Sequence, residues 1–97
     1  MRIIALKTLR EFWEENPDVR QSLQSWYEDV WHAVWKSPAD IKSVYRNASI
    51  IANNRVVFNI KGNSHRLIIA VNYRFGFAYI RFIGTHKEFD RIDAAEI

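Results

Sequence analysis

The sequence predicts an α+β fold in which an N-terminal helical hairpin packs on a small, mainly antiparallel sheet. Apolar residues recur every three or four positions up to about Tyr45 and every second position after Arg55, so helical periodicity gives way to strand periodicity. A chain of 97 residues supports one hydrophobic core, and we expect residues 1–97 to form a single domain. The hydrophobic fraction of 48% is typical of a folded chain rather than a disordered one.

The first third of the chain predicts a short strand and two helices. Ile3 and Ile4 suggest the strand, directly before a helix start. From Thr8 the spacing predicts a helix that ends before Asn16-Pro17, because proline disfavours helix in the residue that precedes it. Pro17 suits the first turn of the second helix. Helical spacing relates the apolar residues of that helix, which are Val19, Leu23, Trp26, Tyr27, Val30 and Val34.

A third, shorter helix is predicted to run from Ser37 to about Tyr45. Ser37 is its N-cap, and Asp40 follows three residues later, in the manner of a capping box. After Asn47 the period changes to two, and residues 48–52 are expected to add a short strand.

Residues 55–83 predict a three-stranded antiparallel meander. Gly62-Asn63 supplies a two-residue turn, which places Asn59 opposite Arg66. A second reversal in residues 74–77 is expected to pair Tyr73 with Ala78. This register collects the apolar side chains on one face, suited to cover by the helices. The expected core face comprises Val56, Phe58, Ile60, Leu67, Ile69, Val71, Ile80 and Phe82, with Val71 opposite Ile80 and Ile69 opposite Phe82.

Basic residues are segregated along the chain. Between Asp40 and Glu88 there are eight Lys or Arg side chains and no Asp or Glu, although the net charge of the chain is only +3. The expected register places several of them on the sheet face opposite the core, and this face comprises Arg55, Asn59, Lys61, Arg66, Asn72, Tyr79 and Arg81. An arginine-rich surface without carboxylates favours a phosphate polyanion, most often nucleic acid. The simpler alternative is a solvated sheet face.

The amino-acid composition excludes several kinds of site. The chain has no Cys, which excludes disulfides, Cys-type zinc sites and a thiol nucleophile. Its three His are widely separated, so neither a metal ion nor another cofactor is predicted. No apolar run approaches the ~18–20 residues of a membrane span, and we expect a cytoplasmic protein that does not enter a membrane. His86 is expected close to His65 and Arg66, where it either transfers protons or serves only as a surface or capping residue.

The motifs that carry a family resemblance lie mainly in the expected strands. They are residues 53–63 (NNRVVFNIKGN), 65–73 (HRLIIAVNY) and 79–86 (YIRFIGTH), preceded by residues 35–42 (WKSPADIK). Together they resemble the HigB toxins of bacterial type II toxin–antitoxin systems, within the RelE superfamily. The resemblance implies a RelE-like toxin that enters the ribosomal A site and cleaves mRNA there without a metal ion. It also implies a cognate HigA-like antitoxin with a helix-turn-helix fold.

The same resemblance implies roles for individual residues. Arg66 matches the arginine that holds the scissile phosphate, Lys61 matches a basic strand residue of the same site, and His86 matches the C-terminal acid/base position. The residues expected to bind RNA or the ribosome are Arg55, Asn59, Asn72, Tyr79, Arg81 and Lys87.

One position departs from the family pattern. Related sequences commonly have Tyr where this chain has Phe89, so a phenolic group cannot take part in catalysis there. Proton transfer then falls to His86, with Glu88 and Asp90 as secondary candidates.

Two other functions compete with a metal-independent, ribosome-dependent endoribonuclease. A ParE-like inhibitor would use the same fold and basic face to bind a protein target such as DNA gyrase, without cleaving RNA. A small RNA-binding module would need the basic face alone and would not be toxic. In the endoribonuclease hypothesis, which we favour, the 2′-hydroxyl of the mRNA attacks the adjacent phosphate, and cationic side chains stabilise the negative charge that develops.

Overall fold

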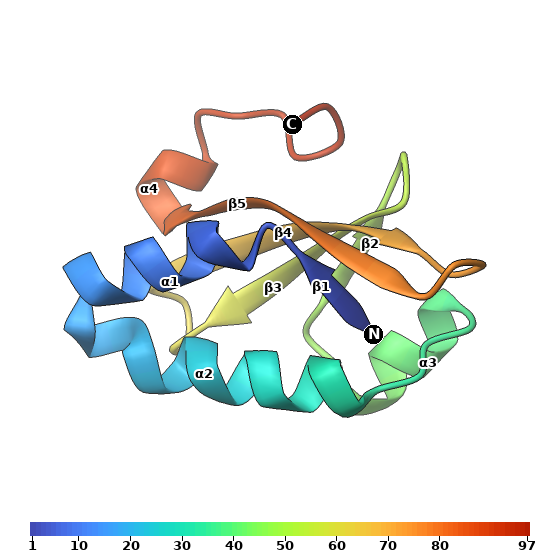
Figure 1. Ribbon diagram of the computed structural model, residues 1–97. Helices are drawn as coiled ribbons and strands as arrows, with labels where there is room; N and C mark the ends of the chain where they lie inside the picture. The colour runs from blue at the N-terminus through green and yellow to red at the C-terminus, as the bar shows by residue number, and fades with distance from the viewer.

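The computed structural model describes residues 1–97 as a five-stranded mixed sheet with three helices on one face and the C-terminal segment, which includes a short fourth helix, on the other (Figure 1). The elements in chain order are β1 (Arg2–Ile4), α1 (Leu6–Glu15), α2 (Pro17–His32), α3 (Pro38–Val44), β2 (Ser49–Ile51), β3 (Arg55–Ile60), β4 (His65–Asn72), β5 (Phe77–Thr85) and α4 (His86–Phe89). The strands lie in the order β1-β5-β4-β3-β2. Only β1 and β5 are parallel. The expected α+β class is therefore confirmed.

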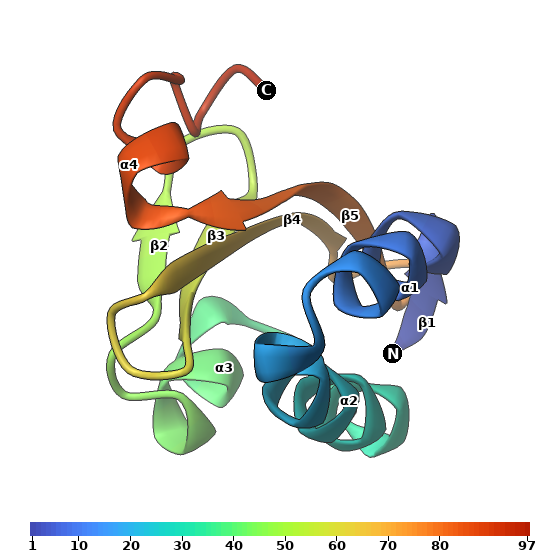
Figure 2. The ribbon, with the colours of Figure 1, turned by 90° about the vertical axis from the view of Figure 1, so that its left-hand side faces the viewer.

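The turn of the helical hairpin lies where the sequence places it. α1 ends at Glu15, and the side-chain amide of Asn16 donates to the carbonyl oxygen of Phe12 at 2.9 Å. Pro17 then occupies the first turn of α2, where its missing N–H costs nothing. Figure 2 shows α1, α2 and α3 together on one side of the sheet and α4 on the other.

α2 is shorter than its apolar spacing suggests. It ends at His32, and Val34, expected on its apolar face, is 71% exposed. The amine of Met1 donates to the carbonyl oxygens of Val30 at 2.9 Å and of Trp31 at 3.3 Å, and so contacts the end of this helix. Trp35 then returns to the core and stacks on Phe58, with ring centroids 6.3 Å apart. None of the helices has the length and hydropathy needed to cross a membrane.

The predicted capping box at α3 and the two short strands are present. The Asp40 carboxylate accepts the backbone N–H of Ser37 at 3.2 Å, which fixes the first turn of the helix. β1 adds to β5 at one edge of the sheet, and β2 adds to β3 at the other.

The register of β3 with β4 is the expected one. Asn59 pairs with Arg66, and Phe58 pairs with Leu67. The ladder ends at the pair of Ile60 with His65, so residues 61–64 form the turn. In this turn Lys61 and Gly62 both adopt positive φ, of 51° and 66°.

The expected register of β4 with β5 is wrong. Val71 pairs with Ala78 rather than Ile80, because Gly76 takes a φ of 73° and donates its N–H to the carbonyl oxygen of Asn72. The turn therefore lies one residue earlier than expected, which shifts the pairing by two residues. A β-bulge then changes the pairing, because Ile69 lies opposite Ile80 while Ile68 lies opposite Phe82.

The bulge exchanges the faces of the residues that follow it. Arg81 is the extra residue of β5, so Phe82 leaves the core face on which we expected it. Ile83 pairs with Leu67 and packs against the main core in its place. The other expected core-face residues are all buried there, namely Val56, Phe58, Ile60, Leu67, Ile69, Val71 and Ile80.

The face opposite the helices is not uniformly polar. Val57 and Ile68 lie on it and are nonetheless buried, with 6% and 0% of their surface exposed. The C-terminal segment crosses this face (Figure 1), and the side chain of Asn53 donates to the carbonyl oxygen of Ala95 at 2.9 Å. A second, smaller apolar layer therefore divides the polar side chains of this face into separate groups.

Candidate active site

Arg66 lies near the start of β4, on the face of the sheet opposite the main core. Its Nη1 atom is 3.2 Å from the carbonyl oxygens of both Asn63 and His65, and its guanidinium carbon is 6.0 Å from the centroid of the Phe89 ring. Contacts to the turn and the ring hold the planar group in one orientation, while part of its five N–H groups stays free for an anion.

The short helix α4 is fixed to the strand end beside Arg66. Thr85 is its N-cap, and its hydroxyl accepts the N–H of Glu88 at 3.1 Å. The Glu88 carboxylate accepts the N–H of Thr85 at 2.8 Å, and this backbone hydrogen bond lowers the pKa of Glu88 from its ordinary value of 4.5. The N–H of His86 donates to the carbonyl oxygen of Ser64 at 3.0 Å. The expectation that His86 lies beside the start of β4 is thus confirmed.

Gly84 allows this close approach of strand and helix. It lies directly opposite Arg66 in the sheet. A Cβ atom at this position would lie 2.7 Å from the ring of Phe82 and 3.1 Å from the carboxylate of Glu88. Any larger residue would displace the ring of Phe82, so glycine allows α4 to leave β5 without a shift of its neighbours.

His86 and Asp90 form a pair on the exposed side of α4. The Nδ1 atom of His86 is 3.0 Å from Oδ2 of Asp90, and about half of each side chain is exposed. A carboxylate only accepts hydrogen bonds, so Nδ1 carries the proton of this contact and Nε2 is left for another partner. Of the two secondary carboxylate candidates, Asp90 therefore contacts the histidine, whereas Glu88 caps its own helix.

His65 belongs to the core rather than to this group. Only 8% of its surface is exposed, its ring packs edge-on against Phe12, and its Nδ1 atom is 2.8 Å from the hydroxyl of Ser64. His65 therefore lies on the core side of the sheet, at the start of β4.

Lys61 points away from the face that carries Arg66. Its ammonium group is 3.7 Å from the carboxylate of Asp18, in the first turn of α2. Both side chains are about half exposed, so this pair contributes at most ~1 kcal/mol to stability. The expectation that Lys61 shares a face with Arg66 is wrong, because the positive φ of Lys61 turns the chain towards the helices.

Arg55 and Arg81 converge, but on the C-terminal segment rather than with Arg66. Nε of each is 3.1 Å from the backbone oxygen of Ile97. Tyr79 lies beside them, with the Arg81 guanidinium 4.9 Å from its ring centroid. The four basic residues expected to converge thus separate into three places.

The other expected RNA-binding residues also differ in their surroundings. The side chain of Asn72 accepts the N–H of Phe75 at 2.8 Å and so stabilises the β4–β5 turn. Lys87 is exposed on α4, and Asn59 is exposed next to Arg66 in the sheet. The structure brings together Arg66, Asn59 and α4, and it leaves Asn72 at the far end of β4.

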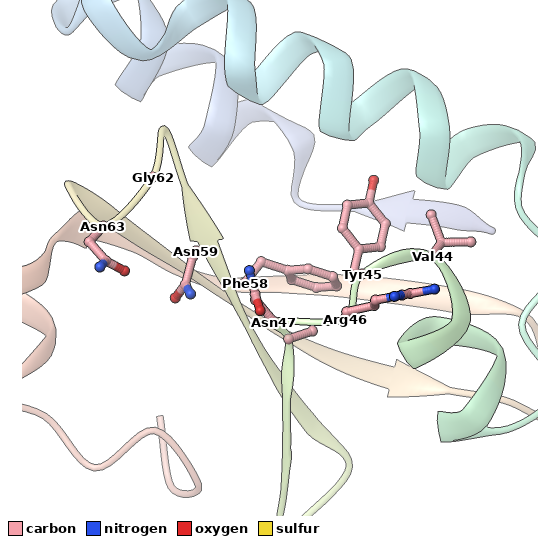
Figure 3. A pocket seen from close by; sticks show the side chains of 9 residues that line it. Val44, Tyr45, Arg46, Asn47, Phe58, Asn59, Gly62 and Asn63 are labelled. Atoms are coloured by element: carbon pink, nitrogen blue, oxygen red, sulfur yellow. The ribbon is translucent and has the colours of Figure 1, made fainter.

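A cleft next to Asn59 was not anticipated from the sequence. It has a volume of about 550 Å³ and lies between the chain that joins α3 to β2 and the β3–β4 turn (Figure 3). Its polar lining includes Arg46, Asn47, Asn59 and Asn63. Asn47 lies in a short loop without periodicity, and the only signal for it was its place just before the expected strand at residues 48–52.

Comparison with known proteins identifies the family. A family model described as HigB_toxin, the RelE-like toxic component of a toxin-antitoxin system, matches residues 19–92, which include Arg66, the cleft and α4. This chain belongs to the HigB toxin family. It is similar to the mRNA interferase toxin HigB of Escherichia coli (strain K12) and to proteins named mRNA interferase HigB from Escherichia coli O157:H7 and Shigella flexneri. Each is 28% identical over 92 residues, which cover 93% of this chain and 88% of the relative. The HigB-family chain is accordingly the toxin component of a toxin–antitoxin system.

Proposed function

We propose that this HigB-family chain is an endoribonuclease that cleaves translated mRNA on the ribosome, without a metal ion, and so inhibits translation. The names of its relatives support mRNA as the substrate. The observation that carries the proposal is the orientation of Arg66, held by the β3–β4 turn and Phe89 beside a helix that bears a His–Asp pair. An oriented cation next to a proton-transfer group is what phosphodiester cleavage requires.

The proposed reaction is an internal transfer at phosphorus. The 2′-oxygen loses its proton and forms a bond to the adjacent phosphorus, while the bond from phosphorus to the 5′-oxygen breaks and that oxygen gains a proton. The products are a 2′,3′-cyclic phosphate and a free 5′-hydroxyl. The phosphoryl oxygens carry extra negative charge in the transition state, which Arg66 is placed to stabilise without moving.

In this proposal His86 transfers a proton and Asp90 positions it. With Nδ1 occupied by Asp90, the Nε2 atom of His86 is available to the 2′-oxygen or to the leaving 5′-oxygen. Glu88 takes no direct part, because its carboxylate caps α4.

The partners follow from the same proposal. We place the toxin in the A site of the cytoplasmic ribosome and infer that a HigA-like helix-turn-helix antitoxin neutralises it. Two exposed cations, Lys87 on α4 and Arg46 in the lining of the cleft, suit contacts to RNA phosphates. Binding to the ribosome is then expected to weaken steeply as salt concentration rises.

A variant of His86 tests the proposal directly. His86→Ala should reduce single-turnover cleavage of mRNA on programmed ribosomes by about 100- to 10,000-fold, the usual contribution of a general acid or base. It should leave the melting temperature and antitoxin binding unchanged, since His86 is half exposed. Gln24→Ala, on the exposed side of α2, is the matched control and should cleave as the wild type does.

The same experiment separates the alternatives. If His86→Ala arrests growth as strongly as the wild type and mRNA is intact in both cases, the nuclease assignment is wrong and a ParE-like inhibitor of a protein target is favoured. If expression of the wild-type chain without its antitoxin neither arrests growth nor cleaves mRNA, the nuclease is again excluded.

A further inference from the structure

The cleft beside Arg66 is lined by two asparagines, Asn47 and Asn59, whose side chains form no hydrogen bond within the chain. Asn59 and Asn63 lie at one end of it, and Asn47 and Arg46 lie towards the other (Figure 3). We propose that this cleft binds the nucleotide next to the scissile phosphate and contacts its base through the amides of Asn47 and Asn59. The inference rests on the proposed function, to which it adds a subsite for base recognition.

The presence of an asparagine at position 59 is not explained by the formation of the sheet. It lies within β3 between the buried residues Phe58 and Ile60, although asparagine is disfavoured in strands. Its side chain is exposed and makes no hydrogen bond within the chain. In the sheet it lies directly opposite Arg66, so a group bound to the arginine is next to this amide.

Asn47, on the opposite wall of the cleft, also has an exposed side-chain amide without a hydrogen bond. Asn16, Asn53 and Asn72 each form a side-chain hydrogen bond with the backbone, whereas Asn47 is exposed and forms none. Arg46, next to it, forms no ion pair. One wall of the cleft therefore offers a free amide and a free cation.

Asn63 connects the cleft with Arg66. Its carbonyl oxygen accepts from the guanidinium of Arg66 at 3.2 Å, and its side-chain oxygen is 3.5 Å from Nη2 of the same group. A phosphate at Arg66 and a base in the cleft would thus lie on either side of Asn63. In the proposal, a phosphate and the neighbouring base of one RNA strand occupy these two adjacent places.

Size and chemistry both suit a nucleotide. The cleft volume of about 550 Å³ is within the range of ~300–1,000 Å³ that small-molecule sites occupy. An amide both donates and accepts, so it can pair with the edge of a base that is exposed in single-stranded RNA. Tyr45 and Phe58 supply apolar wall to the cleft.

The first test measures cleavage preference. Sites cut in a mixture of mRNAs on ribosomes are mapped for the wild type, Asn47→Ala, Asn59→Ala and the control Gln24→Ala. Loss of a good base contact should lower the ratio of cleavage at preferred to other sites by about 5- to 100-fold. Gln24→Ala, which removes an amide from α2, should keep the wild-type ratio.

The second test needs no cleavage. Side-chain amide signals of Asn47 and Asn59 are followed by NMR while an RNA trinucleotide is added that carries a 2′-O-methyl group at the scissile position. The signals should shift with this RNA but not with the same RNA lacking the base that enters the cleft, and Asn59→Ala should weaken the response of Asn47.

The two tests distinguish the subsite from the nuclease function. Equal shifts with and without the base, together with an unchanged cleavage ratio in Asn59→Ala, would overturn the subsite while leaving the nuclease intact. Base-dependent shifts in a wild-type protein that cleaves no mRNA would support the subsite and overturn the nuclease.

Discussion

The Nδ1 atom of His86 lies 3.0 Å from Oδ2 of Asp90, the residue that directly follows α4. The contact is local, yet its position is set by distant parts of the chain, because the N–H of His86 is bound by the carbonyl oxygen of Ser64 in the β3–β4 turn. The orientation of the imidazole therefore depends on the same turn that holds Arg66.

Asp90→Asn is expected to slow cleavage without weakening the binding of the substrate. The amide keeps the shape of the carboxylate but removes the charge that stabilises protonated His86. The loss should be smaller than that of His86→Ala, which removes about 100- to 10,000-fold. Single-turnover rates at saturating ribosome concentration give the comparison. A change in the half-saturating concentration alone would show that Asp90 does not position His86.

Arg66→Lys should lose nearly as much activity as Arg66→Ala. Loss of one oriented donor to a transition-state oxygen costs about 100- to 1,000-fold. Lysine restores the charge but cannot make the planar contacts with Asn63 and the Phe89 ring. Arg74→Ala is the control, since Arg74 is exposed in the β4–β5 turn. Full activity in the lysine variant would mean that charge alone suffices.

Phe89→Ala should reduce cleavage by only a few-fold. The ring centroid is 6.0 Å from the Arg66 guanidinium, at the outer limit of a cation–π contact worth ~0.5–1 kcal/mol at exposed sites. Phe89→Tyr keeps the ring and should retain the wild-type orientation of Arg66. Activity assays of the pair give the measurement, and a loss in the alanine variant as large as that of Arg66→Ala would contradict this ranking.

Lys61→Ala should affect cleavage much less than Arg66→Ala. The lysine pairs with Asp18 on the helical side of the sheet, and the pair is too exposed to contribute more than ~1 kcal/mol to stability. Parallel assays of cleavage rate and urea denaturation check both statements. A loss of activity equal to that of Arg66→Ala would show that Lys61 turns to the mRNA on the ribosome.

The charge of Glu88 should stabilise the fold only above acidic pH. The backbone hydrogen bond from Thr85 lowers the pKa of Glu88 below 4.5 in the folded state. Its contribution is therefore complete above that value and is lost as the pH falls through the lower folded pKa. Glu88→Gln should be less stable than the wild type by about 0.3–1 kcal/mol at neutral pH, and the difference should vanish in acid.

Urea denaturation of both proteins across this pH range gives the measurement. Glu28→Gln on α2 is the control, because Glu28 is exposed and accepts no side-chain hydrogen bond. A difference between wild type and Glu88→Gln that did not change with pH would contradict the assigned role of the charge.

The sequence predicts those parts of the fold in which pattern and turn chemistry agree. The β3–β4 register follows from the turn at Gly62-Asn63, which is compatible with only one pairing of the apolar sets. In the β4–β5 hairpin, a shift by two residues keeps every side chain on its face, so alternation could not decide between pairing Val71 with Ile80 and pairing it with Ala78. The register of this hairpin is decided by Gly76, which adopts a left-handed backbone conformation.

The candidate site was predictable to a similar degree. Family resemblance selected Arg66 and His86, and the structure places them at one end of the sheet. The sequence indicates the burial of Val57 and Ile68, because they are apolar residues on a face that is otherwise expected to be polar. It does not indicate that the C-terminal segment covers them, because residues 90–97 have no periodicity. Asn47 and the cleft depend on tertiary packing alone.

The bulge at Arg81 reverses which side chains of β5 face the main core. From Phe77 to Ile80 even-numbered side chains face the main core, and from Phe82 to Thr85 odd-numbered ones do. Substitutions within the strand leave this arrangement in place, whereas removal of a single residue would rotate Gly84 and the start of α4 to the helical side. Relatives of this toxin should therefore vary in the composition of β5 far more readily than in its length, and alignment gaps between Ile80 and Thr85 should mark proteins that have lost the cleavage site.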